Sequence, residues 1–462
     1  MSRTRVAYLS TLAFCLALGT SLAAVSSLAT VQAPEYSFTA FSDPTTSMSS
    51  TAFGAPQKMF SADIYGPGRR QVRVALAAPV NFNGTDSSSV SQHLNDQIVH
   101  NLSFLPIMTV IPYNAILGGI RISGPTRELI DFRRFQLAGA DLVITAGWID
   151  KNVELRVFEA FTTRMIVGKS YKDVANAQVF EIADRFCAAL LEALTGHGEF
   201  FRSTLAFIRP GGPKGSSALC TVKPTGRDLR ILTAVKGYIL SPGWSSDARL
   251  ICYTQIDDRY HQLGIFDRFS GNVKLFKFPG NNIIGPTFTP TGQVAVSLIQ
   301  GKDPNIYLLD GNYKLSRPLV FNPGINVSAD FDRTGGKMVY VSDCTGKPQI
   351  YLTDGGEGKR ITGGSYDTDP SLAPDGNAVV FARRVADGFR IFFLDLTNGM
   401  EQQISGGPGN DETPVFCPDG FFVAYSRGGS KLYLTTRHGD QAVEIPINGA
   451  ASFPSWGLTE RP

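Results

Sequence analysis

A short phrase recurs six times in the C-terminal half of the chain, and its spacing limits the possible folds more than any other feature. Each copy has a large apolar residue followed by a turn rich in Pro, Asp and Gly, except the last copy, Phe453–Trp456, which has no turn. The six apolar residues are Trp244, Phe288, Phe331, Leu372, Phe416 and Trp456. A period of about 40–45 residues, filled with short strands and turns, is typical of β-propeller blades.

The strands outside the six phrases indicate how the propeller closes. Three predicted strands, Thr204–Ile208, Ala218–Val222 and Asp228–Ala234, precede the first phrase, whereas no strand follows the last phrase. If the C-terminal strand joins these three, the ring closes with six blades and two free sheet edges disappear. An open array would leave both edges unpaired. We therefore expect residues 201–462 to form a six-bladed β-propeller.

The pattern between residues 71 and 200 predicts a small α/β domain. Apolar residues recur there at helical spacing in three segments and in strand-like runs elsewhere. The predicted helices are Ser88–Phe104, Thr126–Ala138 and Ala175–Leu194, and the predicted strands are Val72–Val80, Met108–Pro112, Ala140–Trp148, Val153–Ala160 and Met165–Tyr171. The domain has no glycine-rich phosphate loop, so nucleotide binding is not predicted. The fold class is mainly β, a propeller preceded by a small α/β domain.

The N-terminal region predicts export. Residues 1–33 read as a signal peptide, with Arg3 and Arg5 before an apolar stretch and small residues ahead of several possible cleavage points. The alternative, a membrane anchor, would require a charged stop that this stretch lacks. Residues 34–70 are expected to form a flexible N-terminal segment, because residues 34–56 are mostly Ser, Thr, Pro and Ala. Within it, Met59–Gly66 is apolar enough to dock on another surface or to add as a strand.

Composition and cysteine usage narrow the function classes. The chain has 43 Lys and Arg against 40 Asp and Glu, so a large nucleic-acid footprint is not predicted. Five cysteines remain beyond the predicted signal peptide, and none forms a CxxC motif. They are either buried thiols or include a Cys220–Cys252 disulfide, and the sequence leaves both open.

Motifs for catalysis, cofactors and metals are missing from the sequence. No GxSxG or HExxH occurs, so catalytic, cofactor-binding and metal-binding residues are not predicted. What remains is a polar, partly acidic set of residues just before each phrase, which would ring one mouth of a propeller channel. This set is either solvated loop or a pocket for a segment of a partner protein. Two rival hypotheses are an exported hydrolase or lyase, with Asp369 and Asp411 as paired carboxylates, and a carbohydrate-binding propeller.

Several stretches resemble the TolB family, the periplasmic component of the Tol–Pal system. The most specific are Gly346–Tyr351, Lys359–Thr362, Asp411–Pro414 and the closing Phe453–Trp456, and the match covers nearly the whole chain after the signal peptide. The resemblance implies a monomeric periplasmic protein that is not an enzyme, binds no cofactor and serves outer-membrane integrity and cell division.

The resemblance also implies two partners and their sites. In this family the propeller mouth binds the peptidoglycan-associated lipoprotein Pal, and the N-terminal segment contacts the inner-membrane protein TolA. The mouth positions are Asn282, Gly285, Asn326, Asp367, Asp369, Asp411, Glu412 and Thr413. The N-terminal positions are Phe60, Ser61, Ala62, Asp63, Ile64 and Tyr65. The chain departs from the family in its Ser/Thr-rich stretch and in Ser328-Ala329, where an acidic residue and proline would be expected. We expect the two sites to influence each other through the domain interface.

Overall fold

The computed structural model describes residues 70–82, 89–117, 127–210, 215–257, 260–278 and 283–460. Residues 70–200 contain a mixed sheet with strand order β3-β1-β4-β5-β6, and β2 also pairs with β4. Strands β1 and β3 and strands β1 and β4 run parallel, while β4, β5 and β6 are antiparallel. The strands are β1 Val72–Leu76, β2 Val80–Asn81, β3 Met108–Ile111, β4 Leu142–Ile149, β5 Asn152–Glu159 and β6 Met165–Tyr171.

Helices cover both faces of this sheet. Helices α2 (Ser89–Ser103) and α4 (Val179–Thr195) pack on one face with Val153 and Leu155 of β5. Helix α3 (Phe132–Leu137) packs on the other, where Phe132 meets Phe158 edge-on at 5.8 Å. Short 3₁₀ turns occupy Tyr113–Ala115, Arg127–Leu129, Asn176–Gln178 and Phe200–Arg202. None of the helices in these described ranges is long and apolar enough to cross a membrane.

The predicted helix Thr126–Ala138 was wrong in its extent. The described part of it consists of the 3₁₀ turn Arg127–Leu129 followed by the six-residue α3. Asp131 lies between them with φ −80° and ψ 83°, outside the helical region. Ile130 points into the core beside Phe132 and Phe135 instead of continuing the helix, so tertiary burial overrides the helical spacing.

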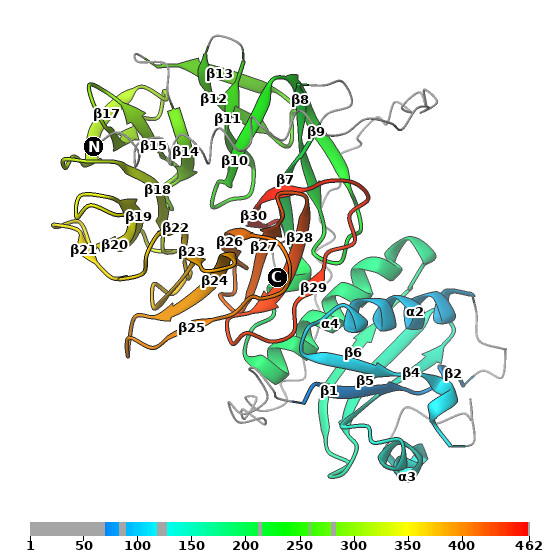
Figure 1. Cartoon of the computed structure of the whole chain (residues 1–462). Coiled ribbons are helices and arrows are strands. Elements are labelled where there is room, and N and C mark those ends of the chain that lie inside the picture. Colours follow the sequence, from blue (N-terminus) through cyan, green and yellow to red (C-terminus); the bar gives the residue numbers. More distant parts are fainter. Residues whose placement is uncertain are drawn as a thin grey trace. The chain divides into compact units, whose positions relative to one another are not determined.

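The remaining strands form six four-stranded antiparallel sheets arranged as propeller blades (Figure 1). Blade 1 has β10 Tyr238–Trp244, β11 Leu250–Ile256, β12 His261–Asp267 and β13 Val273–Lys277. Blade 2 has β14 Ile283–Phe288, β15 Val294–Ile299, β16 Pro304–Leu309 and β17 Leu315–Val320. Blade 3 has β18 Asn326–Phe331, β19 Met338–Ser342, β20 Gln349–Thr353 and β21 Lys359–Arg360.

Blade 4 has β22 Asp367–Leu372, β23 Ala378–Val385, β24 Gly388–Asp395 and β25 Glu401–Gln403. Blade 5 has β26 Asp411–Phe416, β27 Phe422–Arg427, β28 Lys431–Thr436 and β29 Val443–Glu444. Blade 6 combines both ends of the propeller: β30 Ser452–Leu458, β7 Ser203–Pro210, β8 Ser216–Val222 and β9 Arg230–Lys236. The prediction of a six-bladed ring closed by the C-terminal strand is confirmed.

Two contacts fix the closure of the ring. Trp456 on β30 lies opposite Leu205 on β7, and its indole Nε1 donates a hydrogen bond of 2.5 Å to the Ser203 hydroxyl. Trp244 Nε1 of blade 1 donates to the Ser455 carbonyl at 3.2 Å. The last phrase therefore needs no turn, because its strand pairs with β7 and not with a strand that follows it in sequence.

A shared core and one buried ion pair connect α4 with the propeller. The apolar cluster around α4 continues through Phe200 to Phe422, whose rings lie 4.5 Å apart. Both Asp184 oxygens on α4 accept hydrogen bonds of 2.6 Å from Arg227 in the β8–β9 turn. The Cys220 and Cys252 thiols are free and buried. They are therefore buried thiols and not a disulfide.

Candidate partner-binding site

The innermost strand of every blade is kinked at the same point. Its pairing register with the second strand breaks there, and one residue adopts a left-handed backbone with φ between 50° and 58°. The six residues are Ser241, Gly285, Ser328, Asp369, Thr413 and Phe453. Proline follows all of them except Ser328. Since proline donates no ladder hydrogen bond, it is tolerated in a strand at such a bulge.

These kinks surround an open cavity of about 610 Å³, lined by the six innermost strands and by the turns that follow them. Left-handed non-glycine residues cost about 1–3 kcal/mol each and concentrate at functional sites. Five of the six kinks are at non-glycine residues. The closed ring holds this strained geometry in place, and the cavity that it surrounds is the candidate site.

Three of the acidic residues at or beside this cavity have pKa values raised by burial. Burial raises the pKa of Asp330 to about 6, although it accepts a hydrogen bond of 2.8 Å from the Leu372 amide. Burial also raises the pKa of Asp369. The pKa of Glu412 rises to about 7 through burial and through the neighbouring charges of Asp369 and Asp411. Near neutral pH the Glu412 carboxyl can therefore either donate a hydrogen bond to a partner or accept one.

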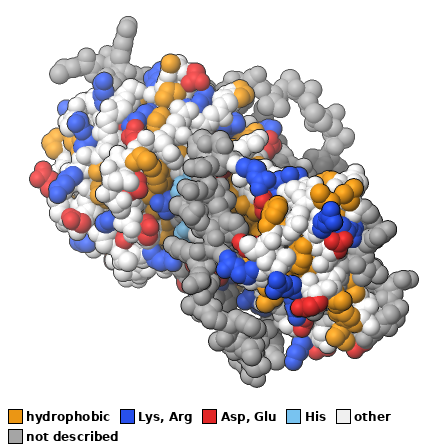
Figure 2. Space-filling model, turned by 90° about the horizontal axis from the view of Figure 1, so that it is seen from below, with side chains coloured by type: hydrophobic (Ala, Val, Ile, Leu, Met, Phe, Trp, Pro, Cys, Tyr) orange, Lys and Arg blue, Asp and Glu red, His pale blue; other side chains and the backbone are white. Residues whose placement is uncertain are grey.

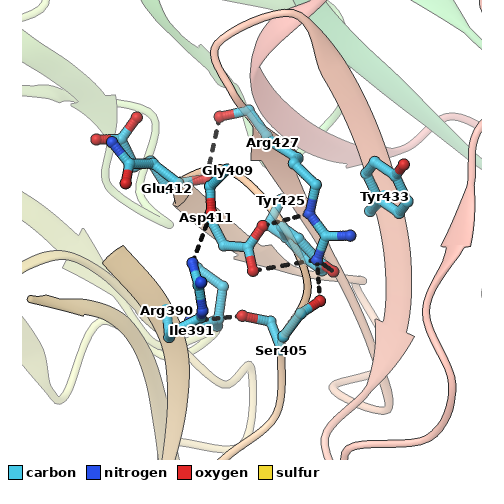
Figure 3. Close-up of polar contacts among 12 residues, drawn as sticks. Arg390, Ile391, Ser405, Gly409, Asp411, Glu412, Tyr425, Arg427 and Tyr433 are labelled. Atoms are coloured by element: carbon cyan, nitrogen blue, oxygen red, sulfur yellow. Dashed lines mark hydrogen bonds and ion pairs between the residues drawn. The ribbon is translucent and has the colours of Figure 1, made fainter. Parts of the chain in front are cut away.

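A different pair of carboxylates binds arginine within the blades. Asp367 and Asp411 begin the innermost strands of blades 4 and 5, and the side chains of both are 0% exposed. Asp367 accepts hydrogen bonds of 2.7 and 3.0 Å from Arg383. Asp411 accepts bonds of 2.6 and 3.1 Å from Arg427 (Figure 3). Each arginine lies directly across the strand pair from its aspartate, so these bidentate pairs fix the two strands.

Arg427 also holds the loop that enters blade 5. Its guanidinium lies 4.3 Å from the centroid of the Tyr433 ring and donates to the Gly406 carbonyl at 2.6 Å. From the neighbouring blade, Arg390 donates to the Gly409 carbonyl at 2.6 Å (Figure 3). In the same view Glu412 points away from the Asp411–Arg427 pair. Adjacent residues therefore have different environments: Arg427 holds Asp411 within the blade, whereas Glu412 is half-buried and lies outside this ion pair.

The predicted mouth residues separate into three groups. Gly285, Asp369 and Thr413 line the cavity, and Glu412 is half-buried beside them. Asn326, Asp367 and Asp411 are 0% exposed, and the Asn326 amide donates to Asn305 at 2.9 Å. Asn282 and residues 60–65 lie outside the described residues.

Sequence reasoning missed the cavity residues Asp330, Ser241, Ser328 and Phe453. The signal for three of them was present, because Ser241 and Phe453 precede the proline of their phrase and Ser328 is the equivalent residue. No group of His, Cys, Asp and Glu in the described ranges could hold a metal ion. The paired-carboxylate hypothesis loses support, because the Asp411 carboxylate is already bound by Arg427.

A family model described as the TolB β-propeller domain matches residues 191–460. The chain belongs to the TolB family. It is 48% identical over 290 residues to the Tol-Pal system protein TolB of Nitratidesulfovibrio vulgaris, covering 62% of this chain and 65% of that protein. It is 25% identical over 400 residues to the Tol-Pal system protein TolB of Francisella tularensis, covering 79% and 90% of the two chains.

The solved structure of TolB from Acinetobacter baumannii has the same fold. Its TM-score is 0.71 at 21% identity, covering 84% of this chain and 97% of that one. The aligned region spans less than two thirds of the Nitratidesulfovibrio protein's own length. The matched relatives are named as Tol-Pal system proteins, in agreement with the family expected from the sequence.

Proposed function

We propose that the chain is a periplasmic protein-binding component of the Tol–Pal system, which links Pal to the inner-membrane Tol complex through TolA. It would thereby support outer-membrane integrity and cell division. The observation that carries the proposal is the family match across the whole propeller. A signal peptide at residues 1–33, an α/β domain at 71–200 and a propeller at 201–462 complete the proposed layout.

Pal is proposed to bind at the cavity mouth. Asp369, Glu412 and Thr413 are the side chains with the geometry to contact it, because Asp369 and Thr413 line the cavity and Glu412 is half-buried beside them. Gly285 would contribute backbone, and Asn282 lies just before β14. Asn326, Asp367 and Asp411 would act indirectly, since their polar atoms hold the innermost strands in place.

TolA is proposed to bind Phe60–Tyr65, within the N-terminal segment at residues 34–70, which precedes β1 in the chain. Binding at the two sites would be coupled through the contacts between α4 and the propeller. Two ion pairs support this route: Asp184–Arg227 at 2.6 Å, and Glu199–Arg333 at 3.0 Å, in which Arg333 also lines the cavity. Coupling of this kind is reciprocal and typically amounts to about 1–3 kcal/mol.

Calorimetry with the soluble domain of Pal tests the mouth. The variant Glu412→Gln with Thr413→Val should bind Pal at least about tenfold more weakly, which corresponds to roughly 1.4 kcal/mol. The control Glu357→Gln changes an exposed carboxyl on the β20–β21 turn and should bind normally. Equal Pal affinity of the double variant and the control would refute the mouth assignment.

Deletion experiments test the second site and the coupling. Removing residues 57–67 should abolish TolA binding, whereas removing residues 40–50 from the Ser/Thr-rich stretch should not. With Pal at saturation, TolA affinity should change by a factor of about 5–150. An unchanged TolA affinity would refute the coupling but leave both binding sites intact.

A further inference from the structure

The outermost strand of blade 1, β13, is unlike those of the other blades. Its five residues pair with β12 in unbroken register, from Val273 opposite Phe266 to Lys277 opposite Gln262. The outermost strands β21, β25 and β29 have only two or three residues each. The register of β9 and of β17 is interrupted, and β17 also contains Pro318. Edges that are short, bulged, or carry proline or lysine resist pairing with another chain, and of these features β13 has only its two lysines.

The outer edge of β13 is available for pairing. The strand lies at the end of its sheet, at the rim of the propeller (Figure 1). Among the described residues, no backbone hydrogen bond joins Val273–Lys277 to anything on the side away from β12. Four of the five residues are exposed. A row of free N–H and C=O groups of this kind is a template for an added strand.

Apolar side chains flank this edge. Val273 and Leu275 are 39% and 44% exposed. The ladder places them on the same face as Phe266, which packs against Ile208 of blade 6. On the adjoining β12–β13 turn, Phe269 is 73% exposed. Exposed apolar groups that continue along an unpaired strand favour protein contact over solvent.

The charges at this edge select the partner. Lys274 and Lys277 are exposed and form no ion pair within the described part of the chain, and the strand carries no acidic residue. Lys277 Nζ lies 4.0 Å over the Tyr260 ring. If β13 of a second copy of the chain paired antiparallel with this strand, centred on Leu275, each lysine would lie opposite an apolar residue. The positive charges would then have no counter-charge. Acidic residues opposite the lysines would gain cross-strand attraction.

We propose that β13 is a docking edge, which binds by strand addition an extended, largely apolar partner segment with two acidic residues three positions apart. Backbone hydrogen bonds would supply affinity, and the lysines together with Val273 and Leu275 would supply selectivity. This surface is separate from the cavity mouth, since none of the residues of β13 lines the cavity.

Binding of a synthetic peptide to the intact chain tests the proposal. The probe is the capped heptapeptide Thr-Glu-Val-Ile-Glu-Val-Thr, which in antiparallel register sets one Glu opposite each lysine. Fluorescence anisotropy measures its affinity, and amide hydrogen exchange should show protection at residues 273–277. The same peptide with Lys in place of both Glu should bind at least about tenfold more weakly, because two attractive pairs become repulsive.

Charge-reversal variants supply the control. Lys274→Glu with Lys277→Glu should invert the preference, so that the lysine peptide binds better than the glutamate peptide. The control variant, Lys314→Glu with Arg317→Glu, reverses two charges at the same spacing, one just before β17 and one on it. It should still bind the glutamate peptide better than the lysine peptide. Equal binding of both peptides, equal effects of both variants, or protection elsewhere without protection at β13 would overturn the proposal. If sedimentation shows a dimer and Lys274→Glu abolishes it, the edge binds a second copy of the chain. That result would also overturn the proposal.

Discussion

Replacing Arg427 by Met should separate the architectural role of the buried aspartates from a role in binding. Met has a similar length and can retain part of the packing against Tyr433. It cannot donate to Asp411, whose side chain is 0% exposed and receives two hydrogen bonds from Arg427. The variant therefore leaves a buried carboxylate without its counter-ion. Removing one partner of such a pair costs about 3–5 kcal/mol.

That cost corresponds to a measurable loss of thermal stability. An unfolding entropy of ~2.1 cal/mol/K per residue, over a cooperative unit of roughly 390 residues, gives about 0.8 kcal/mol/K. We therefore expect the melting temperature of Arg427→Met to fall by about 4–6 °C in differential scanning calorimetry. Arg317→Met, which changes an exposed arginine on β17, should melt like the parent chain.

Two further measurements complete this test. The double variant with Asp411→Asn should melt higher than the sum of the two single effects predicts, because the residues form one ion pair. Pal binding measured below the melting range should change less than with Glu412→Gln and Thr413→Val. An unchanged melting temperature for Arg427→Met, or strict additivity in the double variant, would refute the reasoning. Loss of Pal binding without loss of stability would make the pair a contact site.

Three other changes have expected outcomes of different kinds. The pKa of Glu412 is about 7 in the folded state against 4.5 unperturbed. Between these two pH values the folded state keeps a proton that the unfolded state has lost, so the free energy of unfolding falls as the pH rises. Glu412→Gln should therefore melt like the parent near pH 4 and higher than the parent at pH 8, and a constant difference across this range would contradict the burial argument. Gly264→Ala should destabilise the chain by about 1–3 kcal/mol in urea titration, because a Cβ there would lie 2.3 Å from the Tyr253 ring; a neutral effect would mean that the ring moves freely. Deleting residues 452–462 should remove β30, expose the edge of β7 and abolish cooperative unfolding by circular dichroism, whereas a single sharp transition would show that the ring does not need its closing strand.

The fold was largely determined by local sequence. The period of the repeated phrase gave the number of blades, because each copy encodes one innermost strand and the turn after it. The missing turn after Trp456 and the three strands before Trp244 were enough to predict closure. The one clear error, the helix at 126–138, arose where burial of Ile130 overrode helical spacing.

The division of roles at the mouth depended on tertiary structure. Asp367, Asp369, Asp411 and Glu412 look alike in sequence, as polar residues at the start of an innermost strand. Strand residues alternate between faces, and the left-handed kink then breaks that alternation, so a short polar run does not reveal which side chain reaches the cavity. Arg427, the partner that buries Asp411, comes from the next strand and meets it only through the strand register. The sequence by itself therefore determined the ring and its mouth, and only the packed ring decided which carboxylates hold the blades and which face the cavity.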